Sequence, residues 1–176
     1  MTIQDLTPQH VEQLGALIER LPDSDLTFIK SDVSPAALAG LPTAPGRRWV
    51  DVDDDGTVNG IAALLTLTSW SDHVAELRLV VDPATRGRGI GRKLAKHAVA
   101  HAVRSGLLKV VVEVPAAQGR ITEMFLDLGF TGEALLRDHF RDRDGQLQDL
   151  IMLAYLAEQA YEALSSVGMA DMLGGE

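Results

Sequence analysis

Residues 79–91 read Leu-Val-Val-Asp-Pro-Ala-Thr-Arg-Gly-Arg-Gly-Ile-Gly. They begin as the end of a strand predicted over 75–81, continue through alternate glycines, and enter a helix predicted over 89–104. Glycines let a backbone approach a ligand closely because they carry no Cβ. The N–H groups and the dipole at a helix N-terminus favour an anion. This stretch therefore predicts a cradle for a phosphate-bearing ligand.

The distribution of charge also indicates a local anionic ligand. The chain of 176 residues has a formal net charge of −9, yet residues 83–112 hold seven Lys or Arg and no Asp or Glu. A nucleic-acid-binding protein is more often basic, so we expect no nucleic-acid partner. The sequence contains no cysteine, which excludes disulfides, a thiolate zinc site and a cysteine acyl-enzyme.

The elements predicted on either side of this stretch follow one order. Upstream we expect a short strand over 3–6, helical regions over 8–21 and 25–39, the second broken at Ser34-Pro35, and strands over 49–53, 58–68 and 75–81. Downstream we expect a strand over 107–114, a helix over 116–128, and a hairpin of strands over 130–140 and 147–156. The nearly continuous apolar run at 107–114 indicates a strand buried on both faces. This order predicts an α/β or α+β fold with a mixed sheet.

The length and the apolar runs bound the class of protein further. A chain of 176 residues predicts a single domain over 1–176. No apolar run reaches the ~18–20 residues of a membrane helix. The N-terminus lacks the regions of a signal peptide, so we expect a cytoplasmic protein without a membrane partner.

The glycine loop alone leaves more than one ligand open. A Walker loop needs Gly-Lys followed by a hydroxyl residue, but Gly91 is followed by Arg92 and Lys93. A dinucleotide fingerprint needs unevenly spaced glycines in a first βαβ unit, whereas Gly87, Gly89 and Gly91 are evenly spaced. A nucleotide-binding protein that uses this loop in another way remains an alternative.

A family resemblance narrows the choice. Residues 79–91 resemble the acetyl-CoA motif of the GCN5-related N-acetyltransferases (GNAT), whose core is Gln/Arg-x-x-Gly-x-Gly/Ala; Arg86, Gly89 and Gly91 occupy those positions. The resemblance is strongest over 48–156 and leaves 157–176 as a C-terminal helical tail. It implies a mixed, mostly antiparallel sheet that is splayed at the acetyl-CoA site and flanked by helices.

The resemblance also implies how acetyl-CoA, the cosubstrate, is held. The backbone of Leu79, Val80 and Val81 would pair with the pantetheine arm. The loop amides would hold the pyrophosphate. The residues assigned to this loop are Arg86, Gly87, Arg88, Gly89, Ile90, Gly91 and Arg92.

Acetyl transfer to nitrogen requires a neutral amine. A lysine-like amine has an ordinary pKa of about 10.4, so freeing it at pH 7 costs roughly 4–5 kcal/mol. A carboxylate that accepts the proton serves as general base. Glu76 lies near the base position of the histone-acetylating branch of the family. Glu113 resembles the base of the ribosomal-protein N-terminal acetyltransferases, and it is the one acid in the apolar run 107–114. We favour Glu113 and keep Glu76 as the alternative.

The chain departs from the family pattern at two positions beside the expected cofactor. Gln118 stands where the family often has Asn, and Phe125 stands where it often has a Tyr that serves as general acid. Phe125 cannot donate a proton, so no general acid is assigned. A catalytically silent module that binds or senses acyl-CoA is therefore the alternative to an enzyme.

The sequence gives fewer indications of which residues bind the amine that accepts the acetyl group. Trp49, Trp70 and His73 are candidates for acceptor contact because Trp-Ser-Asp-His is an unusual loop next to the expected splay. His97 and His101 have a spacing that could bind a metal, but no third ligand accompanies them, so we expect no metal. We expect a primary amine as acceptor, and the apolar tail permits a homodimer.

Overall fold

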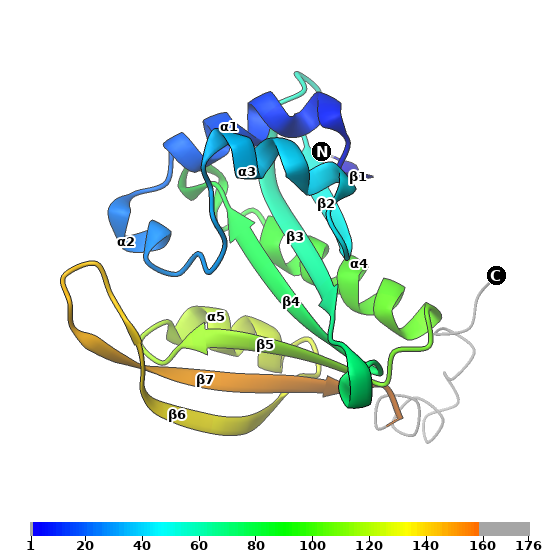
Figure 1. The fold of residues 1–176 in the computed structure, drawn as a ribbon, viewed down its shortest axis with the longest axis vertical. Coiled ribbons are helices and arrows are strands. Elements are labelled where there is room, and N and C mark those ends of the chain that lie inside the picture. Colours follow the sequence, from blue (N-terminus) through cyan, green and yellow to red (C-terminus); the bar gives the residue numbers. More distant parts are fainter. Residues whose placement is uncertain (1, 159–176) are drawn as a thin grey trace.

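The computed structural model describes residues 2–158, and within them seven strands form one sheet (Figure 1). The strand order is β1-β2-β3-β4-β5-β7-β6. All neighbours are antiparallel except β4 and β5, which are parallel. The predicted mixed, mostly antiparallel sheet is confirmed. The strands are β1 (Thr2–Asp5), β2 (Arg47–Val52), β3 (Val58–Thr66), β4 (Val74–Val81), β5 (Lys109–Pro115), β6 (Thr131–Arg141) and β7 (Leu147–Leu156).

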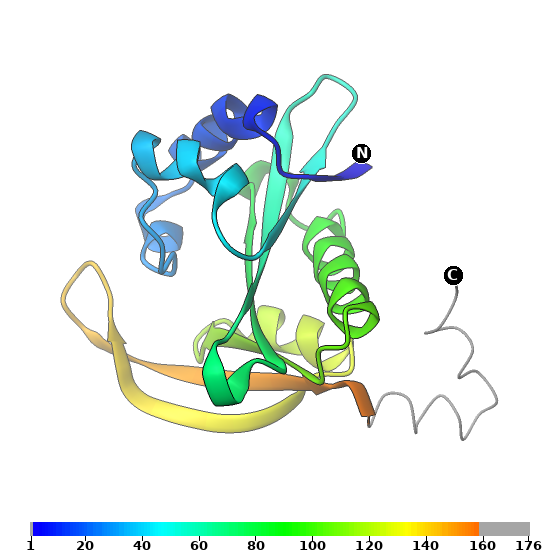
Figure 2. The same ribbon diagram turned by 45° about the vertical axis from the view of Figure 1, so that its right-hand side comes forward.

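The helices flank this sheet. The α-helices are α1 (Val11–Glu19), α2 (Asp23–Leu26), α3 (Pro35–Gly40), α4 (Ile90–Arg104) and α5 (Gly119–Leu126). Single 3-10 turns are η1 (Pro8–His10), η2 (Leu41–Thr43), η3 (Ser69–Ser71) and η4 (Pro83–Thr85). Figure 2 shows α1 and α3 on one side of β2–β4 and α4 on the other. Among the described helices, none has the length and apolar character that crossing a membrane requires.

The helical region predicted over 25–39 is divided into α2 and α3, and the predicted break at Ser34-Pro35 coincides with the start of α3. Ser34 begins α3 because its hydroxyl accepts a hydrogen bond from the Ala37 N–H, and Pro35 occupies the first helical position, where no N–H is needed. Residues 27–34 therefore form a connection between two short helices, and Lys30 lies within it.

Two apolar clusters hold the helices to the sheet. On one face, Trp49, Ala62 and Leu77 pack with side chains of α4 and α5. On the other face, Val50 and Val52 pack with side chains of α1 and α3. Because side chains alternate along a strand, neighbouring residues of β2 serve different clusters.

The burial predicted for β5 is wrong. Val110, Val112 and Val114 are buried in the cluster with α4 and α5, whereas the alternate residues, including Val111 and Glu113, are half-buried. One face of β5 is thus covered by the main core. The other face carries Lys109, Val111, Glu113 and Pro115 and is only partly covered.

The sheet is splayed between β4 and β5. The two strands pair over three positions only, and the last pair is Glu76 with Val111. Beyond it, β4 stays paired with β3 as far as Val81, and β5 stays paired with β7 as far as Pro115. The sheet therefore opens toward the carboxyl ends of β4 and β5. The predicted tail over 157–176 lies almost entirely outside the described residues, and so do the apolar residues that suggested a dimer.

Candidate active site

The splay leaves one edge of β4 next to the glycine loop. Residues 77–81 pair with β3 along one edge, and no strand among residues 2–158 pairs with their other edge. Leu79, Val80 and Val81 are half-buried there. A strand edge of this kind presents N–H and C=O groups that can pair with an extended ligand carrying amides. The geometry fits the expected placement of a pantetheine arm.

The loop after β4 forms an open cradle at the N-terminus of α4. Gly87 and Gly89 have φ of +78° and +79°, and no heavy atom lies within 4 Å of the position that a Cβ would take at either residue. Other residues rarely adopt this backbone conformation, so both positions favour glycine. Asp82 secures the turn that leads to the loop, because its carboxylate accepts hydrogen bonds from Arg20 Nε at 2.5 Å and from the Ala84 N–H at 2.8 Å.

Two other loop positions differ from the expected arrangement. Gly91 faces β4: a Cβ there would lie 3.4 Å from Leu79 and 3.5 Å from Val81. The side chain of Ile90 is buried in the core. Gly91 thus permits close packing of α4 on β4, and only the backbone of Ile90 is available to a ligand.

The arginines of the loop are held to different degrees. Arg86 donates to the Asp25 carboxylate at 2.5 Å, and Arg92 donates to Asp127 at 2.7 Å. Arg88 is exposed and has no ion pair among residues 2–158. Sequence reasoning missed both carboxylates, because each lies far from its arginine in the chain.

The structure brings Glu76 and Glu113 together around one ammonium group. Glu76 is the last β4 residue that pairs with β5, and its partner there is Val111. Glu113 lies two residues after Val111, so it is on the same face of the sheet as Glu76. Lys30 Nζ lies 2.9 Å from Glu76 Oε1 and forms a second ion pair with Glu113 Oε2. The exposed fractions of the two glutamate side chains are 15% and 18%. No sequence pattern connects Lys30 to these carboxylates.

Glu76 and Glu113 have different partners. Glu76 also accepts hydrogen bonds from Arg78 Nε at 3.1 Å and from Arg78 Nη2 at 2.9 Å. Burial acts to raise the pKa of Glu76, but hydrogen bonds from Arg78 and Lys30, together with their charges, hold that pKa below its ordinary value. Glu76 is therefore ionised at neutral pH. Because its cationic partners stabilise the ionised form, Glu76 is a weak proton acceptor.

Comparison with known proteins identifies the family. Residues 16–130 match the model of the Acetyltransferase (GNAT) family. The chain belongs to this family. The resemblance seen in the sequence is confirmed.

Individual GNAT relatives match parts of the chain. Mycothiol acetyltransferase from Rhodococcus jostii is 33% identical over 113 residues, which are 64% of this chain and 36% of that protein. The ribosomal protein bS18-alanine N-acetyltransferase from Escherichia coli K12 is 27% identical over 97 residues, which are 54% of this chain and 66% of that protein. The chain thus spans less than two thirds of either relative. A solved GCN5-related N-acetyltransferase from Kribbella flavida has the same fold, with a TM-score of 0.77 and 22% identity, over 88% of this chain and 96% of that one.

Three residues predicted to serve the GNAT site lie elsewhere. Trp49 is 3% exposed and packs edge-on against His97 and His101 of α4, on the face of the sheet opposite Glu76. It is a core residue, because strand alternation turns it away from the polar face. Trp70, which is 93% exposed, lies in η3, and His73 directly precedes β4, at the closed end of the splay. The backbone carbonyl of His73 accepts hydrogen bonds from the first residues of the β5 region.

The two departures from the GNAT pattern also have clear positions. Phe125 is 1% exposed and packs edge-on against Phe130, with ring centroids 5.1 Å apart. Its ring is enclosed by the core, so this placement does not favour contact with CoA. Gln118 is half-buried and immediately precedes α5, beyond the end of β5. Its role toward the cofactor stays a prediction.

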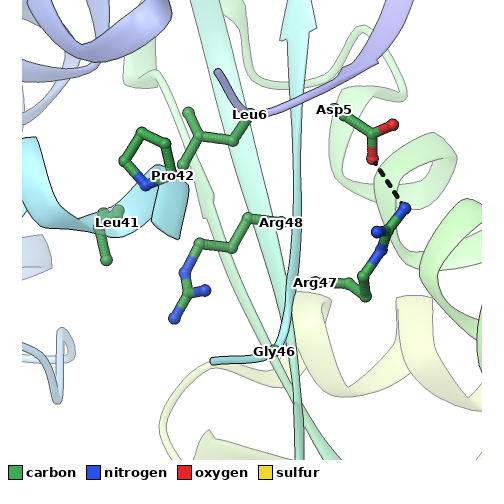
Figure 3. Close-up of a pocket in the computed structure, with 7 residues that line it drawn as sticks. All are labelled: Asp5, Leu6, Leu41, Pro42, Gly46, Arg47 and Arg48. Atoms are coloured by element: carbon green, nitrogen blue, oxygen red, sulfur yellow. Dashed lines mark hydrogen bonds and ion pairs between the residues drawn. The ribbon is translucent and has the colours of Figure 1, made fainter. Parts of the chain in front are cut away.

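A separate pocket lies at the β1–β2 side of the sheet (Figure 3). It has a volume of about 210 Å³ and is lined by Asp5, Leu6, Leu41, Pro42, Gly46, Arg47 and Arg48. Burial lowers the pKa of Arg48, and the nearby charge of Arg78 lowers it further. This pocket lies on β2, two strands away from β4, and it is not the splay. Among residues 2–158, no group of three or more His, Asp or Glu could hold a metal ion.

Proposed function

We propose that this protein is an acetyl-CoA-dependent N-acetyltransferase that moves an acetyl group to a primary amine by direct attack in a ternary complex. The observation that best supports the proposal is the Lys30 ammonium group between Glu76 and Glu113. It occupies the point where β4 and β5 separate. A primary amine at this point lies beside the open strand edge that leads to the glycine cradle.

The residues of the chain account for the reaction as follows. Bound acetyl-CoA would supply the acetyl thioester, held by the backbone of 79–81 and by the loop amides of 87–92. Glu113 would accept the proton of the incoming ammonium group, because it has fewer cationic partners than Glu76. A positioned base of this kind contributes roughly 10²–10⁴-fold in rate. Because the sequence has no cysteine, direct attack by the amine is the simplest route.

The leaving sulfur has no evident protein acid. Phe125 carries no proton to donate, and burial raises the pKa of Tyr155, which packs against Phe130. Water would therefore protonate the thiolate. The fair leaving-group character of a thiolate makes this acceptable, since the pKa of a thiol is about 8.5.

The class of acceptor is inferred from the names of two relatives and from the carboxylate pair of the site. The names of the two curated relatives refer to mycothiol and to an alanine of a ribosomal protein. We infer an acceptor that presents one primary amine to the carboxylate pair, either on a small molecule or on a protein. The second candidate function is a silent acyl-CoA-binding module, which Phe125 in place of a tyrosine favours.

A turnover experiment tests the proposal. Acetyl-CoA is mixed with the protein and a panel of polyamines, aminoglycosides, amino acids and N-terminal peptides, and release of free thiol is measured. The proposal expects thiol release that depends on one class of amine. Binding of acetyl-CoA without such release supports the silent module. Calorimetry with CoA, ATP and NAD is the control, and a preference for ATP or NAD would contradict both functions.

A further inference from the structure

Lys30 differs from the other lysines in its surroundings. The chain has four lysines: Lys30, Lys93, Lys96 and Lys109. Lys93 and Lys96 are exposed on α4. Lys109 pairs with Glu133 at the closed end of the splay. Lys30 alone among them contacts both of the carboxylates proposed as bases.

The segment that carries Lys30 is anchored on both sides of the splay. On the β4 side, Asp25 pairs with Arg86 of the glycine loop at 2.5 Å, and Ser31 accepts a hydrogen bond from Arg78 at 2.9 Å. These contacts hold the chain before and after Lys30 against β4 and its loop. They place Nζ at the carboxylates.

Contacts on the other side reach the β6–β7 hairpin. Phe28 packs edge-on against Phe140, with ring centroids 5.8 Å apart, and Asp23 pairs with Arg143 at 2.7 Å. Figure 1 shows α2 and this hairpin on the same side of the molecule. Anchoring from two sides limits the freedom of the segment, so Lys30 is held in place rather than presented on a free loop.

We propose that Lys30 is an intramolecular acetyl acceptor, modified at Nζ by the site in which it lies. This inference rests on the proposed N-acetyltransferase function. A carboxylate of the pair removes one proton from the Lys30 ammonium group, and the nitrogen lone pair forms a bond to the thioester carbonyl carbon. The bonded nitrogen gives up its second proton, the carbon–sulfur bond breaks, and the sulfur leaves as a thiolate that takes up one proton. The products are acetyl-Lys30, free CoA thiol and one proton.

The test uses purified protein, acetyl-CoA and no added amine. Peptide mass spectrometry follows the acetylation of all four lysines with time. Lys30 should be acetylated about tenfold or more faster than Lys109, its ion-paired control, because only Lys30 has a base and a bound donor nearby. The first-order rate constant for Lys30 acetylation should not depend on protein concentration, since the acceptor is in the same molecule. Lys30→Arg should remove the fast phase and leave the slow background at the other lysines.

Defined results would overturn the inference. Equal rate constants at Lys30 and Lys109, or a first-order rate constant at Lys30 that rises in proportion to protein concentration, contradict an intramolecular acceptor. If external amines are nevertheless acetylated, the proposed enzyme function stands and Lys30 only occupies the acceptor position. If neither Lys30 nor any amine is acetylated and calorimetry finds no acetyl-CoA binding, the proposed function fails as well.

A second readout needs no acetyl-CoA. The lysines are labelled by reductive ¹³C-methylation, and their NMR signals are compared between the parent protein and Glu113→Gln. The Lys30 signal should move while that of Lys109 stays in place, because only Lys30 contacts Glu113. An unchanged Lys30 signal contradicts the placement of Nζ on which the inference depends.

Discussion

At the scale of single residues, the carboxylates of the candidate site separate into two kinds. Glu113 is half-buried and is paired with Lys30, whereas Glu76 is paired with both Lys30 and Arg78. The second cation keeps the pKa of Glu76 low. Glu113 is thus the better candidate for accepting a proton, and the difference can be measured.

Glu113→Gln should lower kcat about tenfold or more at pH 7 and leave acetyl-CoA binding intact, because it removes a base and keeps the shape. The loss should shrink as pH rises, since free amine then becomes abundant. Steady-state kinetics across pH check this, with Glu76→Gln as the matched variant. If Glu76→Gln shows the larger defect that high pH relieves, the two roles are reversed.

Gly89→Val should abolish measurable acetyl-CoA binding while the protein stays folded. The new side chain would enter the open space of the cradle, and φ of +79° would be strained. Gly56→Val is the matched control, because Gly56 also has a positive φ of +82° and open space around it, and it lies in the turn between β2 and β3. Both variants should lose similar thermal stability, and only Gly89→Val should lose affinity in calorimetry. Equal binding by both variants would remove the loop from the cofactor site.

Asp51 is a buried carboxylate whose two oxygens have no hydrogen-bond partner among the described residues. Burying a carboxyl group without hydrogen-bond partners is costly. Asp51→Asn should therefore leave the free energy of unfolding unchanged or raise it, as measured by urea denaturation. Asp82→Asn is the contrasting variant, because Asp82 is buried with Arg20 and a backbone N–H as partners, and its change should cost about 1–3 kcal/mol. A larger loss of unfolding free energy in Asp51→Asn than in Asp82→Asn would contradict the conclusion that the Asp51 carboxyl group has no stabilising partner.

At the scale of elements, the short α2 and the connection after it act on two sites at once. The same segment presents Asp25 to the glycine loop and Lys30 to the carboxylate pair. A helix this short is marginal in isolation. Its position therefore depends on these contacts across the sheet.

Asp25→Asn should strengthen acetyl-CoA binding about two- to tenfold at low salt, because it frees Arg86 and removes a negative charge near the phosphates. Calorimetry at two salt concentrations measures the effect, which should be smaller at high salt. Asp23→Asn is the control, since Asp23 pairs with Arg143 of the distant hairpin. Weaker binding by Asp25→Asn would instead show that the ion pair positions Arg86 for the ligand.

At the scale of the whole molecule, the free energy of unfolding should depend on pH through two histidines of α4 and through Glu76 of β4. Burial is the largest cause that lowers the pKa of His97 and His101, and nearby arginines lower it further. Below their ordinary value of 6.5, the unfolded chain therefore binds more protons than the folded one. Glu76 acts in the same direction below pH 4.5, because its pKa in the folded chain is also lowered and the unfolded chain again binds more protons.

The melting temperature should accordingly be lower at pH 5.5 than at pH 7.5, and it should fall again as Glu76 becomes protonated below pH 4.5. Calorimetric scans across pH measure both steps. The double variant His97→Gln, His101→Gln should weaken the first step and keep the second. A melting temperature that rises on acidification to pH 5.5 would mean that folding raises the pKa of these histidines instead of lowering it.

Local chemistry explains which features could be read directly from the chain. Strand and helix periodicity, Pro35 after Ser34, and glycines at positive φ act over a few residues, so the element order and the loop before α4 were predictable. The prediction that β5 is buried on both faces failed for the complementary reason. An apolar run does not reveal that Glu113 and its face would be left only partly covered.

The remaining features of the site depend on tertiary packing. Lys30 and Glu76 are 46 residues apart in the chain, and Asp25 and Arg86 are 61 apart. Such pairs depend on where the sheet brings distant segments, and no spacing rule encodes them. Trp49 was a candidate for acceptor contact, and the family resemblance placed Phe125 beside the cofactor, yet the side of the strand and the enclosure of the ring place both in the core. Side-chain identity sets what a residue can do, and the surroundings that folding creates select which of those roles it performs.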